Sequence, residues 1–155
     1  MIEREHEALK LRVATVGGIR DHDGTVGITA SGKQQLSAAG AAWQKYLALN
    51  PKKPDEGLAR QMLQAYASLN QLDKATSAQE IVAQVDPTQQ TFTNLAILAY
   101  QANQARKGDL AAAKAVSLAP KKQQKDLKKQ LDQYKLQSQA QQLQQAQPTA
   151  TATVG

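Results

Sequence analysis

The chain has 155 residues, of which 41% are hydrophobic, and it contains one tryptophan, four tyrosines, one phenylalanine and no cysteine. This length favours one domain with a modest core. The absence of cysteine excludes disulfides, thiolate metal sites and a cysteine nucleophile. The longest unbroken apolar run, Leu95 to Tyr100, is far shorter than the roughly 20 residues that span a bilayer. Ala, Leu, Gln and Lys dominate the composition, which favours helix along most of the chain.

Lysine and arginine outnumber aspartate and glutamate by 19 to 13, which gives a net charge of +6. Residues 1–104 contain ten of each sign, so nine cations and three acids remain beyond residue 105. The positive excess therefore belongs to the last predicted helices. The nine cations are Arg106, Lys107, Lys114, Lys121, Lys122, Lys125, Lys128, Lys129 and Lys135, and the three acids are Asp109, Asp126 and Asp132.

The first predicted element is a helix over residues 2–16, because Ile2, Leu9, Val13 and Val16 recur on one helical face. Residues 17–30 contain four glycines, two aspartates and a histidine, which predicts a loop inserted into the fold.

Ser31 is then the expected N-cap of a helix that runs to about Asn50. Apolar side chains recur there at steps of three and four residues, which is the spacing of one helical face. They are Leu36, Ala39, Trp43, Tyr46 and Leu47, and the proline-containing segment 50–54 ends the helix.

Two helix pairs follow. The first comprises residues 55–68 and 73–85, joined by a turn around Asn70. The second comprises residues 88–104 and 109–118, joined by a turn at Lys107-Gly108.

A last helix is predicted over residues 121–146, and residues 147–155 are expected to be disordered. Its apolar stripe is thin and consists of Leu127, Leu131 and Tyr134. The polar remainder suits a capping helix at the end of an array.

Prolines 51, 87 and 120 punctuate the chain at intervals of 36 and 33 residues, each after an apolar helix end, which indicates an internal repeat. The repeat resembles the tetratricopeptide (TPR) family. The middle copy offers Ala59, Met62, Leu63, Tyr66, Ala75, Val82 and Pro87, with Gln79 in the family's aromatic slot; the third offers Phe92, Leu95, Ala96, Ala99, Gly108, Ala112, Ala115 and Pro120, with Tyr100 one residue late. The first copy has its second helix in Ala39, Trp43, Tyr46 and Pro51, and residues 2–16 are interpreted as its displaced first helix.

The resemblance implies an all-α superhelix of about three helix hairpins with a C-terminal capping helix, in one domain over residues 1–146. It also implies that the first helix of each hairpin lines a concave groove that holds a peptide or a helix of another protein. By helical spacing, the residues that face this groove are Arg60, Gln64, Ala67, Thr93, Asn94, Ile97 and Gln101.

Two further motifs resemble ligand sites but depart from them. Residues 27–34 have the two glycines and the lysine of a phosphate-binding loop, yet Gln34 stands where Ser or Thr must ligate magnesium. The segment Asp21-His22-Asp23-Gly24 lacks the spacing and the distal glutamate of a calcium loop. We therefore expect no nucleotide, cofactor or metal site, and His6 is expected to be a surface residue.

The sequence thus predicts a non-catalytic scaffold for protein–protein interaction, with another protein or peptide as its partner and no small-molecule substrate. The alternative is a basic helical adaptor that contacts nucleic acid or an anionic membrane through the lysine-rich last helix. Nucleic acid is the less favoured partner because aromatic side chains are sparse among the lysines. The start in mid-repeat suggests the soluble part of a longer, membrane-anchored bacterial protein, with the anchor in a segment absent from this chain.

Overall fold

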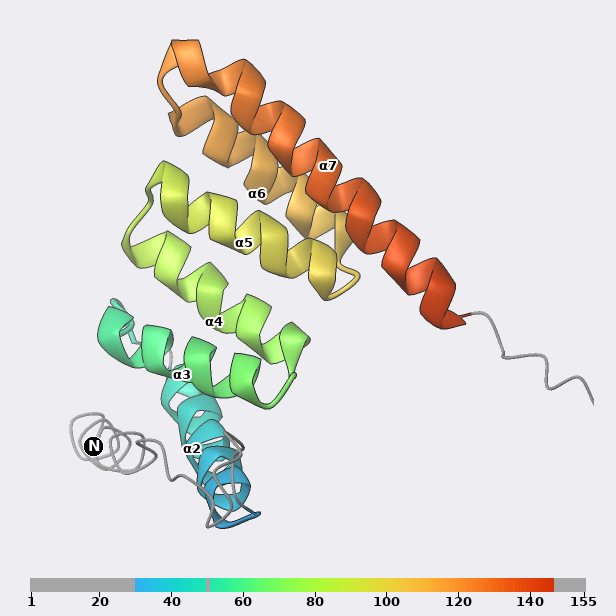
Figure 1. Cartoon of the computed structure of the whole chain (residues 1–155). Helices are drawn as coiled ribbons and strands as arrows, with labels where there is room; N and C mark the ends of the chain where they lie inside the picture. The colour runs from blue at the N-terminus through green and yellow to red at the C-terminus, as the bar shows by residue number, and fades with distance from the viewer. Residues whose placement is uncertain (1–29, 50, 147–155) are drawn as a thin grey trace, which may run out of the picture. The chain divides into compact units, whose positions relative to one another are not determined.

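The computed structural model describes residues 30–49 and 51–146, and every regular element among them is an α-helix (Figure 1). The helices are α2 (Ala30–Ala48), α3 (Glu56–Ser68), α4 (Leu72–Val85), α5 (Gln89–Gln101), α6 (Ala105–Leu118) and α7 (Lys121–Ala146). The all-α prediction is confirmed for these residues. The predicted helix 2–16, most of the loop 17–30 and the predicted tail 147–155 lie outside them.

The chain divides into two compact units, residues 1–87 and 88–155, and each is described by itself. In the first unit α3 packs against α4, and α2 packs against α3. In the second unit α5 packs against α6, and α7 packs against both. Each unit therefore contains one helix hairpin and one additional helix.

The two hairpins begin with side-chain caps. Asp55 precedes α3, and its Oδ1 accepts a hydrogen bond from the Leu58 N–H over 2.9 Å. Thr88 precedes α5 and forms a reciprocal capping box with Thr91, over 3.2 Å and 3.0 Å. A side-chain oxygen at this position satisfies a backbone N–H that has no partner within the helix. The chain therefore sets the start of each hairpin locally.

The two hairpins close with the same turn. Asn70 and Asn103 both adopt the left-handed conformation, with φ of 55° and 58°. Asparagine tolerates this region better than most residues. In each turn the residue after the asparagine donates its N–H to a carbonyl five residues earlier, over 2.8 Å. These bonds run from Gln71 to Tyr66 and from Gln104 to Ala99.

The caps and turns fix one register, with an offset of 33 residues between the hairpins. This register pairs Asp55 with Thr88 and Asn70 with Asn103, and it places Pro54 in the position of Pro87. Pro51, which the sequence pattern aligned with Pro87, is therefore not its counterpart.

Two predicted boundaries are wrong. The turn between α5 and α6 is centred on Asn103 and not on Lys107-Gly108, because the asparagine supplies the left-handed residue and α6 resumes at Ala105. Ser31 lies inside α2, which already includes Ala30, so it is not the N-cap of that helix.

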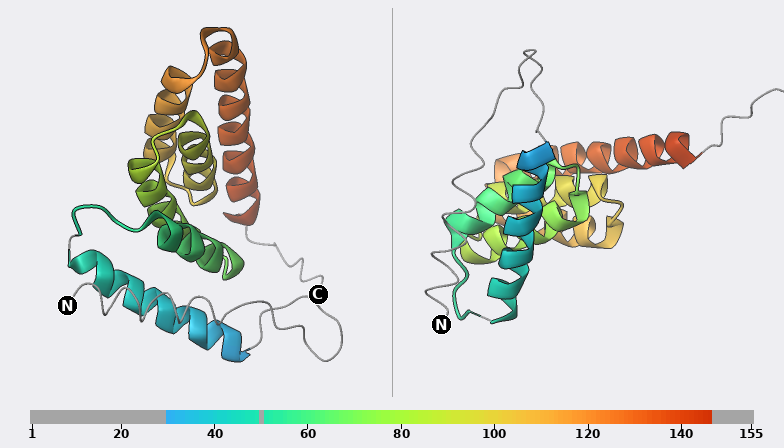
Figure 2. Two further views of the ribbon diagram at one scale, coloured as in Figure 1. Left: turned by 90° about the vertical axis from the view of Figure 1, so that its left-hand side faces the viewer. Right: turned by 90° about the horizontal axis from the view of Figure 1, so that it is seen from below.

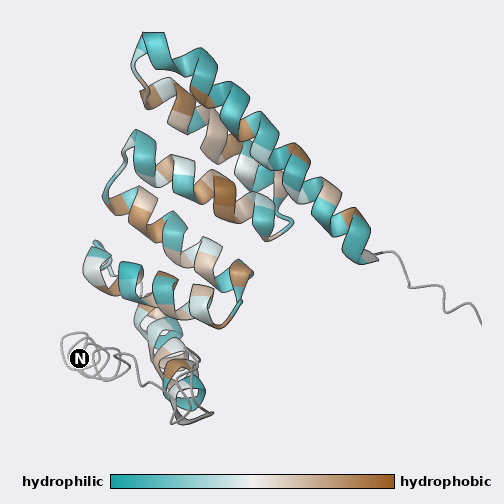
Figure 3. Cartoon of the chain, viewed as in Figure 1, coloured by the Kyte–Doolittle hydropathy of each residue, from teal (hydrophilic) through white to brown (hydrophobic). Residues whose placement is uncertain are grey.

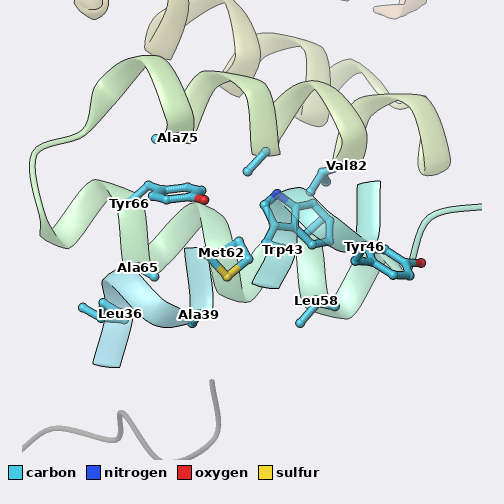
Figure 4. Packing of buried hydrophobic residues seen from close by; sticks show 12 residues of the cluster. Leu36, Ala39, Trp43, Tyr46, Leu58, Met62, Ala65, Tyr66, Ala75 and Val82 are labelled. Atoms are coloured by element: carbon cyan, nitrogen blue, oxygen red, sulfur yellow. The ribbon is translucent and has the colours of Figure 1, made fainter. Parts of the chain in front are cut away.

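The core of the first unit surrounds Trp43, which is 1% exposed (Figure 4). The indole stacks on the Tyr46 ring with centroids 5.5 Å apart, and it belongs to the same cluster as Met62 of α3 and Val82 of α4. Tyr66 is also buried, so the predicted burial of both aromatic residues is confirmed. The cluster consists of Leu36, Ala39, Trp43, Tyr46, Leu58, Ala59, Met62, Ala65, Tyr66, Ala75, Ala78 and Val82.

Gln79, which departs from the TPR pattern at the aromatic slot, is buried. Burying an amide is costly unless it is hydrogen-bonded. No buried side-chain nitrogen or oxygen in the described part of the chain lacks a hydrogen-bond partner. The core therefore accommodates a polar side chain where an aromatic ring was expected.

The second unit has a small-sided core. The buried residues are Leu95, Ala96, Ala99 and Tyr100 of α5, Ala111 and Ala115 of α6, Ala119 after it, and Leu127 and Leu131 of α7. Tyr134, expected to continue the stripe of α7, is 45% exposed, and Ser138 is buried one turn further along. Figure 3 shows α7 as mainly hydrophilic. Helix α7 thus attaches to the hairpin through few apolar contacts.

None of the helices that the structure describes is both long and apolar enough to cross a lipid bilayer.

The Trp43→Ala variant tests the core of the first unit. The substitution removes the largest buried side chain from the contacts among α2, α3 and α4, and we expect a loss of about 3–5 kcal/mol in the free energy of unfolding. Chemical denaturation followed by circular dichroism measures it. Tryptophan emission typical of a water-exposed indole in the folded wild-type chain would contradict the burial of Trp43.

Candidate partner-binding surfaces

Three predicted groove residues lie on α3. Arg60, Gln64 and Ala67 are exposed, and they occupy the side of the helix away from the buried Leu58 and Met62. The structure therefore places this half of the predicted strip on an accessible helical face.

Arg60 is engaged within the unit. Its guanidinium contacts the Glu56 carboxylate at 2.7 Å and the Asp86 carboxylate at 3.4 Å, and its side chain remains 47% exposed. It thus links the first turn of α3 to the C-cap of α4. Exposed ion pairs of this kind contribute little to stability. They do, however, neutralise the one cation of the strip, so an acidic group of a partner would have to compete with two carboxylates.

The other predicted residues lie on α5. Thr93 and Ile97 are half-buried, whereas Asn94 and Gln101 are exposed. The Thr93 hydroxyl donates to the Gln89 carbonyl over 2.8 Å, and the Asn94 side-chain oxygen accepts from Gln90 Nε2 over 3.0 Å. The accessible surface of this half consists mainly of side-chain amides with a partly covered isoleucine.

The 33-residue register refines how the two halves correspond. It aligns Arg60 with Thr93 and Gln64 with Ile97, as predicted from spacing. The counterpart of Ala67 is the buried Tyr100, however, and Gln101 corresponds to Ser68. Because α3 and α5 belong to different compact units, each half of the strip is described on its own helix.

A polar cluster that the sequence analysis missed joins the three helices of the second unit. The Tyr100 hydroxyl of α5 donates to Asp109 Oδ1 of α6 over 3.0 Å. Lys135 of α7 donates to both Asp109 oxygens over 2.8 Å. Gln142, further along α7, donates to the Tyr100 carbonyl over 3.1 Å. The cluster fastens α7 to the hairpin beside its thin apolar stripe.

Charge and burial shift the acid–base equilibria of this cluster. The hydrogen bond from Lys135 lowers the pKa of Asp109 below its usual range, despite the opposing effect of partial desolvation. Burial raises the pKa of Tyr100, and the adjacent Asp109 carboxylate raises it further. Both shifts favour an ionised Asp109 between a neutral tyrosine and a charged lysine.

The cluster depends on Gly108. A Cβ atom on this residue would lie 2.4 Å from Cε1 of the Tyr100 ring. Glycine therefore lets the ring lie directly against the α6 backbone, where its hydroxyl reaches Asp109. The sequence did contain a signal, because Gly108 corresponds to the buried Ala75 in the 33-residue register and Tyr100 stands one residue late. That signal becomes readable only once the turn is placed at Asn103.

The motifs that resemble ligand sites fall mostly outside the described residues, including Asp21-His22-Asp23-Gly24, His6 and the start of the phosphate-loop segment. Its last part, Gly32 to Gln34, lies within α2. Among the described residues, no group of three or more histidines, cysteines, aspartates or glutamates is arranged to hold a metal ion.

Comparison of the chain with protein-family models, with characterised proteins and with solved structures gave no significant match.

The Gly108→Ala variant tests the close approach of Tyr100. Because the added methyl group overlaps the ring, we expect a loss of about 1–3 kcal/mol in the free energy of unfolding. Gly57→Ala is the matched control, since the only atom near its added Cβ is Asp55 Oδ1 at 3.3 Å. The control should be neutral or stabilising by up to about 1 kcal/mol. Equal effects of the two variants would show that the ring does not lie against Gly108.

The Asp109→Asn variant tests the acid dependence of the cluster. A carboxylate with a lowered pKa in the folded state stabilises the fold above its ordinary pKa, and this contribution is lost as the pH falls through the lowered value. We therefore expect unfolding curves between about pH 5 and 2 to show a smaller acid loss in Asp109→Asn than in the wild type. Asp126→Asn removes the same charge from an exposed position of α7 and serves as the control. Identical acid dependence in the wild type and Asp109→Asn would refute the role of Asp109.

Proposed function

We propose that the chain is a non-catalytic scaffold of TPR-like helix hairpins that binds a segment of another protein along the first helices of its hairpins, α3 and α5. The observation that carries the proposal is the common register of the two hairpins. They share side-chain caps, left-handed asparagine turns and terminal prolines at an offset of 33 residues. This offset lies close to the roughly 34-residue period of the TPR family.

The chemistry of the strip indicates which partner it suits. Gln64, Asn94 and Gln101 offer exposed amides, which can both donate to and accept from a peptide backbone. Arg60 is already paired with Glu56 and Asp86, so the strip lacks the unpaired cations that would select a terminal carboxylate. Ala67 and the partly covered Ile97 add small apolar contacts. An extended segment of low net charge, held by polar contacts and one small apolar anchor, fits this set of side chains.

A peptide selected from a displayed random library against the full chain provides the test ligand. We expect two double variants, one on each helix, each to weaken its binding by about tenfold or more, which corresponds to at least about 1.4 kcal/mol. The α3 variant is Arg60→Gln with Ala67→Glu, and the α5 variant is Asn94→Glu with Gln101→Glu. All four positions are exposed, so the fold should be retained. Fluorescence anisotropy measures the affinity.

The matched control is Lys45→Gln with Ala113→Glu, which changes the net charge by the same two units at exposed positions of α2 and α6. Its affinity should stay within about twofold of the wild type. Loss of binding in the control, with unchanged binding in both strip variants, would place the partner site elsewhere.

A further inference from the structure

We propose that the outward face of α7 binds the surface of an anionic lipid bilayer. The contacting residues form what we call the outer strip of α7: Lys122, Lys125, Lys129, Leu136, Ala140 and Leu143. This surface is separate from α3 and α5, so it stands or falls independently of the proposed partner strip.

The outer strip occupies one side of the helix. Steps of three, four and seven residues connect its members, which places them along a single face. Leu127, Leu131 and Ser138, which are buried, lie on the opposite side of α7. The helix is thus fixed to its own unit on one side and presents the strip to solvent on the other.

The strip combines charge with exposed apolar surface. Leu136 and Leu143 are 65% and 69% exposed, the most exposed large apolar residues described in α7. Lys122, Lys125 and Lys129 are exposed and form no ion pair with described residues, whereas Lys135 pairs with Asp109. A basic segment with adjacent leucines on one helical face is typical of surfaces that lie on anionic membranes.

The charge distribution of the chain favours the same partner. Residues 1–87 contain ten charges of each sign, and residues 88–155 contain nine cations against three acids, so the second unit carries the entire net charge of +6. Asp126 and Asp132 flank the strip, and Lys128 offsets Asp132 at 2.9 Å. Each lysine near an anionic surface contributes on the order of 1 kcal/mol, or roughly a fivefold change in partitioning.

The leucines also stand clear of the hairpin. Helix α7 continues past the turn between α5 and α6, and its C-terminal end extends beyond that turn (Figure 1, Figure 2). Residues 136–146 contain no charged side chain, so they can enter the interfacial region without burying a charge.

A bilayer surface fits the strip better than the other partners. Nucleic acid would engage the lysines through phosphates but would leave Leu136 and Leu143 without a role. A second copy of the chain would cover the leucines, but the patch of two leucines and one alanine is small beside the roughly 1,200 Å² of a stable interface. Only a lipid surface uses both halves of the strip.

Co-sedimentation of the full chain with vesicles tests the proposal. We expect binding to phosphatidylcholine vesicles that contain about 30 mol% phosphatidylglycerol, at least about tenfold weaker binding to pure phosphatidylcholine, and weakening as salt is raised. Binding that is equal for both compositions would overturn the proposal.

Two variants separate the contributions of the strip. Leu136→Ser with Leu143→Ser and, separately, Lys122→Gln with Lys125→Gln and Lys129→Gln should each reduce binding at least about tenfold. Their controls are Leu110→Ser with Leu118→Ser on α6, and Lys33→Gln with Lys45→Gln and Lys52→Gln in the first unit, which remove equivalent side chains from other exposed positions. Both controls should bind like the wild type.

Two outcomes would assign the strip to another partner. If the leucine variant binds vesicles like the wild type and a DNA duplex competes with the vesicles, the lysines bind phosphate polymers and the proposal fails. If light scattering shows a dimer that the leucine variant dissociates, the strip is an interface between copies and the proposal fails as well.

Discussion

The closure of each helix hairpin by a left-handed asparagine is the constraint on which the rest of the structure depends. Asn70 and Asn103 end the first helix of each hairpin and let the chain reverse within three residues. A hairpin that closes so tightly presents a continuous apolar side that its own two helices cannot cover completely. In the first unit α2 supplies the cover with Trp43, and in the second unit α7 supplies it with Leu127 and Leu131.

The two covers differ in their physical basis. The first is largely apolar, since Trp43 and Tyr46 stack and contribute to one cluster with both hairpin helices. The second combines a thin apolar stripe with a charged cluster, in which Asp109 accepts from Tyr100 and Lys135. Side chains in the second hairpin are small, so glycine at position 108 allows a tyrosine ring to fill space that alanines leave. This arrangement keeps α7 attached while its polar and basic side remains exposed.

Local signals in the sequence predict most of the fold. Helices α3, α4 and α7 fall within one residue of their predicted bounds, because Asp55 and the asparagine turn act on the nearest few residues. The burial of Trp43 follows from its place on an apolar helical face.

The sequence analysis fails where a residue has two possible uses. Gly108 was interpreted as a turn residue but serves a close packing contact, and Asn103 makes the turn instead. The groove residues could be placed on exposed faces of α3 and α5, but the ion pairs of Arg60 and the cluster around Asp109 could not be predicted. Those contacts join helices 26 residues apart, and no periodic pattern encodes them.

The central claim is that one partner contacts the first helices of both hairpins. The most direct measurement is a nuclear magnetic resonance titration of the isotope-labelled full chain with the selected peptide, following the backbone amides of α3 and α5. The account predicts that the amides of Gln64, Ala67, Asn94 and Gln101 shift together and follow one common dissociation constant. Shifts confined to one of the two helices, or centred on α2 or α6, would contradict it.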